Sequence, residues 1–314
     1  MNILVTGGSG YIGSHTVIEL INNNYNPIII DNFSNSQPWI INQISSIVGK
    51  KITYFDINCC DYKNLKKIFE KYKFSGVIHF AALKSLPESY IFPTKYYENN
   101  ILSTINIINL IKIYNIPYFV FSSSCMVYGE DNVLPINENT NLKPSNSPYG
   151  YTKQICEKII SDTLNKNTFY VSLRYFNPIG AHKSGKIGEL PIGEPSNLIP
   201  YITQTAIGLR KKLIVFGNDY DTPDGTCVRD YINIIDLAKA HVKSLELMQE
   251  KMNSYTFNIG TGNGLSVLEI IKKFENITGE KLNYIIGNRR SGDVEKIYAC
   301  NLSLIHISEP TRQA

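Results

Sequence analysis

Short apolar runs alternate with longer helical patterns through the first half of the chain. The runs at residues 3–5, 27–30, 52–55, 76–80, 118–121 and 168–174 are rich in β-branched and aromatic residues, which is typical of buried strands. Between them, apolar residues recur at helical spacing in the segments 11–21, 38–48, 62–72, 96–114 and 151–164. This order predicts an α/β fold with a doubly wound parallel sheet of the Rossmann type.

The pattern changes after Asn177. Gly, Pro and Asn become frequent between residues 180 and 200, and the alternation of strand and helix stops. Further along, we expect strands at 214–216 and 256–259 and a helix at 266–277. The chain therefore divides into a cofactor-binding domain at 1–176 and a smaller C-terminal substrate-binding domain at 177–303. Whether strands of the second domain return to the first is left open.

A glycine-rich turn joins the first strand to the first helix. Gly8, Gly10 and Gly13 fit the spacing G-x-G-x-x-G. Such glycines allow a tight turn, a close approach of the backbone to a pyrophosphate and close packing of helix on strand, and the helix N-terminus offers free N–H groups to phosphates. The spacing alone is a weak signal, but the second strand ends at Asp31, where a carboxylate accepts hydrogen bonds from ribose hydroxyls and repels a 2′-phosphate. The two features together predict binding of NAD rather than NADP.

The ends of the predicted strands carry the candidate chemistry. Ligands of doubly wound sheets bind beyond the carboxyl ends of the strands. We therefore expect the segments that follow the strands to line one crevice, namely residues 7–13, 31–36, 80–84, 122–124 and 175–177.

Ser124, Tyr149 and Lys153 are the candidate catalytic residues. The spacing Tyr-x-x-x-Lys places both side chains on one helix face. A nearby ammonium and a nicotinamide cation lower the pKa of a tyrosine, ordinarily about 10, so that it acts as a general base near neutral pH. Tyr62 and Lys66 repeat the spacing, but only Tyr149 follows a serine-rich strand end.

Composition and charge exclude several other classes of protein. The 314 residues are 43% hydrophobic and 18% charged, which allows a sizeable core, and the net charge of +4 without a dense basic run gives no support for nucleic-acid binding. The six cysteines form no C-x-x-C, so we expect free thiols in a reducing compartment and no metal. No apolar run reaches the length of about 18 residues that a membrane span needs. We therefore expect a cytoplasmic protein without a membrane partner.

The motifs resemble those of the extended short-chain dehydrogenase/reductase superfamily and, within it, of the UDP-glucose 4-epimerase family. The resemblance extends from Met1 to about Cys300, and its later motifs are particular to the epimerases. The motifs are residues 6–15, 31–35, 79–84, 122–124, 147–150 with Lys153, 174–182, 197–201, 216–220, 224–226, 228–232 and 289–293.

This resemblance implies reversible epimerisation at C4 of UDP-galactose and UDP-glucose, through a 4-keto intermediate and transient hydride transfer to a tightly bound NAD, with Tyr149 as the base. It also implies a role in galactose metabolism and a homodimer. The implied NAD contacts are Gly7, Gly10, Tyr11, Ile12, Gly13, Asp31, Asn32, Phe33, Ser34, Asn35, Ser36, Asn58, Cys59, Phe80, Ala81, Ala82, Leu83, Lys84, Asn99, Ser124, Tyr149, Lys153 and Phe176. The implied UDP-sugar contacts are Lys84, Ser124, Tyr149, Asn177, Asn197, Leu198, Ile214, Val215, Phe216, Arg229, Arg290 and Asp293.

The chain departs from the family pattern near the adenine and in its last residues. The family usually has Asp-Ile at the adenine contact, where an ungapped register puts Asn58-Cys59; Asp56-Ile57 stands two residues earlier, so both pairs remain candidates. Residues 304–314 do not resemble the family. We interpret them as an atypical tail, foreign to a shortened chain. The absence of the family's terminal helices would expose apolar surface and weaken folding.

Other departures leave the candidate catalytic groups in place. Cys125-Met126, Pro87 and Asn233 stand where the family has other residues. Ile297 lies where the family controls access of N-acetylated sugars, and its intermediate size leaves that preference open.

Two alternative functions share some of these motifs. A dehydratase or decarboxylase of the same superfamily is one, but a dehydratase needs an acid pair directly after Ser124, which Cys125-Met126 does not supply. The other is a catalytically silent NAD-binding protein, which typically lacks the Tyr/Lys pair that is intact here.

Overall fold

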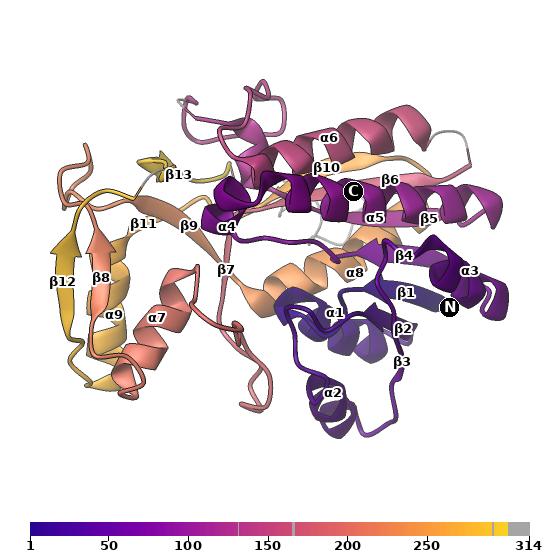
Figure 1. The fold of residues 1–314 in the computed structure, drawn as a ribbon, viewed down its shortest axis with the longest axis horizontal. Coiled ribbons are helices and arrows are strands. Elements are labelled where there is room, and N and C mark those ends of the chain that lie inside the picture. Colours follow the sequence, from indigo (N-terminus) through magenta and orange to yellow (C-terminus); the bar gives the residue numbers. More distant parts are fainter. Residues whose placement is uncertain (131, 165–166, 291, 301–314) are drawn as a thin grey trace, which may run out of the picture.

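A seven-stranded parallel sheet forms the centre of the larger part of the molecule (Figure 1). The computed structural model describes residues 1–130, 132–164, 167–290 and 292–300, so the predicted tail at 304–314 and the end of the predicted second domain lie outside the described residues. The strand order is β10-β6-β5-β4-β1-β2-β3. The order runs outward from β1 in both directions, which confirms the doubly wound sheet. The strands are β1 (Asn2–Thr6), β2 (Asn26–Asp31), β3 (Thr53–Asp56), β4 (Gly76–His79), β5 (Tyr118–Ser124), β6 (Phe169–Tyr175) and β10 (Tyr255–Ile259).

Helices cover both faces of this sheet. On one face lie α1 (Tyr11–Asn22), α2 (Ile40–Val48) and α8 (Ile234–Lys251), and on the other lie α3 (Tyr62–Lys71), α5 (Pro93–Ile113) and α6 (Pro148–Thr163). Successive residues of β1 therefore serve two cores: Ile3 and Val5 pack in the first cluster and Leu4 in the second. Burial on both faces explains why the strands are continuous apolar runs.

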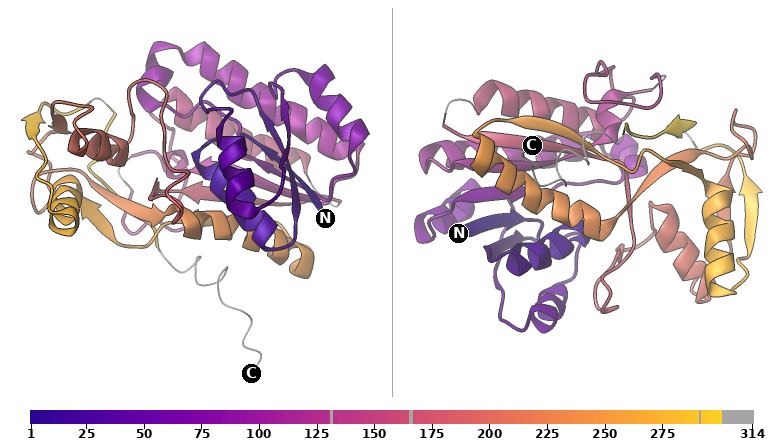
Figure 2. Two further views of the ribbon diagram at one scale, coloured as in Figure 1. Left: turned by 90° about the horizontal axis from the view of Figure 1, so that it is seen from below. Right: turned by 180° about the vertical axis from the view of Figure 1, so that it is seen from behind.

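Two elements from the second half of the chain belong to this layer. β10 pairs with β6 as the edge strand of the central sheet, and α8 packs against α1 (Figure 2). The sequence predicts β10 but assigns no element to 234–251. The signal for α8 is nevertheless present: the Asn233 side chain caps its N-terminus by accepting a hydrogen bond from Ile235 N–H at 2.8 Å.

The smaller part lies beyond the carboxyl ends of the central strands (Figures 1 and 2). One of its sheets contains β7 (Asn177–Ile179), β9 (Val228–Asn233), β11 (Gly264–Ser266) and β13 (Lys296–Ile297), and the other pairs β8 (Leu213–Phe216) with β12 (Tyr284–Gly287) in parallel. A separate core forms between β8 and the helices α7 (Leu198–Ala206) and α9 (Val267–Thr278).

Two short helices follow strand ends of the central sheet. They are α4 (Leu86–Ile91), after β4, and the 3-10 helix η1 (Cys125–Tyr128), directly after β5. Among the described helices, none combines the length and apolar character that crossing a membrane requires.

Candidate active site

A cleft of about 980 Å³ lies between the carboxyl ends of the central strands and the smaller part. The structure brings together along this cleft all of the implied catalytic, NAD and UDP-sugar contacts except Phe33. Gly8 of the glycine turn and Asp56, from the alternative adenine pair, are also absent from its wall. The Phe33 ring instead meets the Tyr54 ring edge to face, with centroids 6.1 Å apart. Ile297, at the predicted N-acetyl position, also lines the cleft.

The glycine turn can adopt its tight conformation only because it lacks side chains at Gly7 and Gly13. Gly7 has a φ of +68°, and a Cβ there would lie 2.9 Å from the backbone nitrogen of Ala81. A Cβ on Gly13 would collide with the carbonyl oxygen of Gly7. No side chain caps the N-terminus of α1 at Gly10, so its first N–H groups remain available. This cradle fits the pyrophosphate of a dinucleotide.

Asp31 is fixed at the end of β2 by three donors. Its Oδ2 accepts a hydrogen bond from Ser9 N–H at 3.0 Å, and its Oδ1 accepts from Phe33 N–H at 2.9 Å and from the Ser36 hydroxyl at 3.0 Å. A carboxylate held in this way beside the glycine turn suits ribose hydroxyls and repels a 2′-phosphate, which fits NAD.

The two candidate adenine contacts differ in their surroundings. Asn58 and Cys59 line the cleft, as does Ile57, whereas Asp56 is exposed and is absent from the cleft wall. The Asn58 side-chain oxygen accepts a hydrogen bond from Cys60 N–H at 2.8 Å, which leaves its amide N–H groups for other acceptors.

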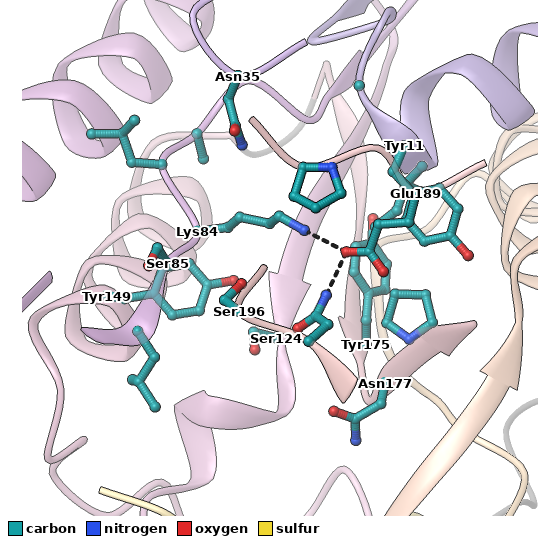
Figure 3. A pocket seen from close by; sticks show the side chains of 18 of the residues that line it. Tyr11, Asn35, Lys84, Ser85, Ser124, Tyr149, Tyr175, Asn177, Glu189 and Ser196 are labelled. Atoms are coloured by element: carbon teal, nitrogen blue, oxygen red, sulfur yellow. Dashed lines mark hydrogen bonds and ion pairs between the residues drawn. The ribbon is translucent and has the colours of Figure 1, made fainter. Parts of the chain in front are cut away.

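The candidate catalytic residues lie where α6 begins beside the end of β5. Ser147 caps α6 by accepting a hydrogen bond from Gly150 N–H at 3.0 Å, which places Tyr149 in the first turn. Figure 3 shows Tyr149 and Ser124 reaching into the cleft from neighbouring elements. Lys153, one turn further along α6, donates a hydrogen bond to the carbonyl oxygen of Ser122 at 2.7 Å.

Burial governs the protonation of this group. It raises the pKa of Tyr149 to about 12, while hydrogen bonding with Ser124 acts in the opposite direction. Burial also lowers the pKa of Lys153 to about 8, against the raising effect of Cys156 and Glu157. The lowered pKa that the sequence predicts for Tyr149 is therefore wrong for the chain alone, because desolvation of the phenolate outweighs the favourable contacts.

The substrate side of the cleft carries two arginines around one carboxylate. Arg290 donates to the two carboxylate oxygens of Asp293 at 3.1 and 2.7 Å, and an Arg229 nitrogen lies 3.6 Å from the same group. The set keeps a net positive charge, which suits a diphosphate. The Arg290 guanidinium also lies 5.5 Å from the centre of the Phe216 ring, beside the partly exposed strand β8.

Glu189 is a cleft residue that the sequence does not single out. Its Oε1 accepts hydrogen bonds from Lys84 Nζ at 3.0 Å and from Asn197 Nδ2 at 2.6 Å (Figure 3). It lies in the Gly- and Pro-rich stretch between β7 and α7, which has no periodicity to reveal which side chains point inward. Glu194 lies in the same stretch, so an acidic residue there does not by itself identify Glu189.

The remaining sequence candidates lie elsewhere. Tyr62 and Lys66, which repeat the Tyr-x-x-x-Lys spacing, are absent from the cleft wall, and Lys66 forms an ion pair with Glu70 at 3.6 Å. All six cysteines are unpaired. Within the described part of the chain, no cluster of three or more His, Cys, Asp or Glu side chains could hold a metal ion.

Comparisons with known proteins agree with this arrangement. The model of the NAD-dependent epimerase/dehydratase family matches residues 3–260. The UDP-glucose 4-epimerase of Drosophila melanogaster is 46% identical over 307 residues, which cover 95% of this chain and 88% of that protein.

Two crystal structures extend the match to three dimensions. The UDP-glucose 4-epimerase of Stenotrophomonas maltophila, with bound NAD and formylated UDP-arabinopyranose, superposes with a TM-score of 0.95 at 40% identity, covering 100% of this chain and 94% of that one. The UDP-glucose 4-epimerase of Bifidobacterium longum, in complex with NAD+ and UDP, gives a TM-score of 0.93 at 42% identity, covering 98% and 92%. The chain therefore belongs to the NAD-dependent epimerase/dehydratase family and, within it, to the UDP-glucose 4-epimerases.

Proposed function

We propose that this chain interconverts UDP-galactose and UDP-glucose by inverting the configuration at C4 of the hexose. The observation that carries the proposal is that Ser124, Tyr149 and Lys153 line the same cleft as the glycine turn and the arginine pair. NAD, when bound, would supply a reversible acceptor for the C4 hydride, and its oxidised nicotinamide would carry a positive charge. The turn at residues 7–13, Asp31 and the loop at 80–84 would hold it.

Tyr149 acts as the general base. It removes the proton from the 4-hydroxyl of the sugar and returns it after the 4-keto intermediate has turned over in the cleft. Its pKa of about 12 in the chain alone means that the phenolate needs nearby positive charge, which Lys153 and the oxidised cofactor together provide. Ser124 shares the proton of the reacting hydroxyl through its own hydroxyl group.

Arg229 and Arg290 hold the UDP moiety while the sugar turns. Epimerisation requires that hydride leaves one face of C4 and returns to the other, so the sugar needs loose contacts and the nucleotide firm ones. Two guanidinium groups on a diphosphate give charge-assisted, directional bonds, which suit an anchor. Leu198 and Phe216 offer apolar surface beside that anchor.

We also propose that the chain works as a homodimer in the cytoplasm. The helices α4, α5 and α6 expose large apolar side chains, including Ile91, Leu102, Ile113 and Tyr151, which supports self-association through this side of the molecule. The unpaired cysteines fit a reducing compartment. Sedimentation equilibrium of the wild type and of Leu102→Glu tests this proposal. We expect the wild type to be a dimer and the variant to shift toward monomer.

The activity is tested with purified protein and UDP-galactose, first without added cofactor and then with NAD. We expect UDP-glucose to appear without added NAD, because the cofactor is expected to copurify. A folded protein that forms no UDP-glucose under either condition would contradict the proposal and favour a silent NAD-binding protein. Release of a 4-keto product instead would indicate another reaction of the family.

A further inference from the structure

The Glu189 carboxylate joins the two sides of the cleft. Only 10% of its side chain is exposed, and the two groups that it binds come from different parts of the molecule. Lys84 lies in the loop after β4, in the cofactor part, and Asn197 directly precedes α7, in the smaller part. Both residues are among the predicted UDP-sugar contacts, so Glu189 connects two ligand-binding side chains without being one of the predicted contacts itself.

The ion pair restrains Lys84. Its side chain is 45% exposed, and an unpaired lysine at such a site would sample many rotamers. An exposed ion pair restrains a lysine weakly, whereas a largely buried carboxylate interacts more strongly because water screens it less. At 3.0 Å from Glu189, the Lys84 ammonium is therefore held inside the cleft before any ligand binds.

Asn197 is oriented by Glu189 rather than by its own helix. It occupies the N-cap position of α7, where an asparagine side chain ordinarily accepts a hydrogen bond from the backbone. Its side chain makes no such bond, although Ser147 and Ser266 do so for α6 and α9. Its amide group instead donates to Glu189 at 2.6 Å. The Asn197 side chain therefore contacts Glu189 in the cleft and does not stabilise α7 as a cap.

The backbone around Glu189 is anchored to the cofactor part. The Tyr11 hydroxyl donates to the carbonyl oxygen of Gly180 at 2.6 Å, and Lys186 Nζ donates to the Ser46 hydroxyl at 2.5 Å. Ile187, which precedes Gly188 and Glu189, is buried in the core cluster that contains α1. These contacts fix the carboxylate at the point where the two donors meet.

We propose that Glu189 is a positioning residue that orients Lys84 and Asn197 for contact with the UDP-sugar. The role rests on the proposed function. Because the carboxylate orders both donors in advance, binding of the nucleotide spends less free energy on ordering side chains. Glu189 itself takes no part in proton or hydride transfer.

The test compares Glu189→Ala with wild-type protein by calorimetry with UDP and by steady-state kinetics with UDP-galactose. We expect the Kd for UDP and the KM for UDP-galactose to rise about tenfold, with kcat changing less than about threefold, because ordering affects binding and not chemistry. In a Lys84→Met background, the same substitution should raise both constants by a clearly smaller factor, because one of the restrained donors is already absent. Glu246→Ala, which removes an exposed pair with Lys243 on α8, is the matched control and should leave both constants unchanged.

Three results would overturn the proposal. A lower Kd for UDP in Glu189→Ala would show that the carboxylate competes with the ligand. Fully additive effects of Glu189→Ala and Lys84→Met would show that Glu189 does not act through Lys84. A lower thermal midpoint with an unchanged Kd would show a purely structural contact. These results can be distinguished from a failure of the proposed function. In that case the wild type would bind UDP without converting UDP-galactose, and the effect of Glu189→Ala on the Kd for UDP could still be measured.

Discussion

The two walls of the cleft are built by different means. The cofactor wall consists of the glycine turn and the loops that follow strands of the central sheet, and their positions are set by pairing in one parallel sheet. The substrate wall is made of side chains from short strands and loops, held by the contacts of Asp293 and Glu189. A rigid wall suits a cofactor that stays bound, and an assembled wall suits a substrate whose sugar must turn. Substitutions on the two walls should therefore impair the enzyme differently: those on the cofactor wall should cause loss of NAD, and those on the substrate wall should raise the KM.

We expect the largest effect on kcat from a substitution of Tyr149, which lies between the two walls. Tyr149→Phe removes the base but keeps the ring, so kcat should fall by about 10²- to 10⁴-fold, in the range that positioned general bases contribute. NAD content and the Kd for UDP should stay near those of the wild type, because neither wall changes. Turnover within a few-fold of the wild type would rule out Tyr149 as the base.

A methyl group in the glycine turn should abolish binding of the whole cofactor. Gly13→Ala places a Cβ against the carbonyl oxygen of Gly7, so the purified protein should lose its bound NAD and its activity together. Gly49→Ala is the control: it lies at φ +70° with open space around the new Cβ, and should cost about 1 kcal/mol of stability without loss of NAD. Absorbance and the mass spectrum of the released nucleotide report the cofactor content. Full NAD retention in Gly13→Ala would refute the role of the turn.

Single substitutions on the substrate wall should weaken substrate binding only in part. Arg290→Gln removes one of two cationic anchors, and we expect the KM for UDP-galactose to rise about ten- to a hundredfold with a smaller change in kcat. The neighbouring Arg289 offers a matched control, since it pairs with Asp219 at 2.7 Å and is not part of the cleft wall. Equal effects of Arg289→Gln and Arg290→Gln would mean that general surface charge, and not a diphosphate anchor, is responsible.

The smallest expected effect is a pH dependence of stability at Lys153. Its pKa lies near 8 in the folded chain and at 10.5 by ordinary values, so between these pH values the unfolded state binds more protons at this site. The free energy of unfolding of the ligand-free protein should therefore rise in this window, by about 1 kcal/mol per pH unit. Urea unfolding at pH 8, 9 and 10 should show this gain in the wild type relative to Lys153→Met. Parallel pH profiles of the two proteins would contradict it.

The same contrast explains which parts of the molecule the sequence predicts. Strands such as β1 and β4 are apolar on both faces, and their periodicity places them within a residue or two of the observed bounds. The glycine turn and the Tyr/Lys pair are local patterns, so they too can be found without a structure. Arg229 and Arg290 have no local signature, and only the family resemblance separates them from surface residues such as Arg289.

Other features depend on contacts that no local pattern encodes. Glu189 meets Lys84 across a separation of 105 residues, in a segment without regular structure. The raised pKa of Tyr149 follows from burial, whereas the motif suggests a lowered one. Phe33 belongs to a matching motif, yet its φ of +53° turns the chain so that its ring packs on Tyr54 instead of lining the cleft.

The place of β10 in the central sheet has a consequence for how the chain is made. Its partner β6 ends at Tyr175, and β10 begins only at Tyr255, after most of the substrate wall has been synthesised. The cofactor-binding part therefore cannot complete its folding early in synthesis. The edge of β6 and the face of α1 stay uncovered until α8 and β10 have left the ribosome. Synthesis of the two walls is interleaved, so the chain should reach its native state as one cooperative unit, and an expressed fragment ending at residue 176 should aggregate.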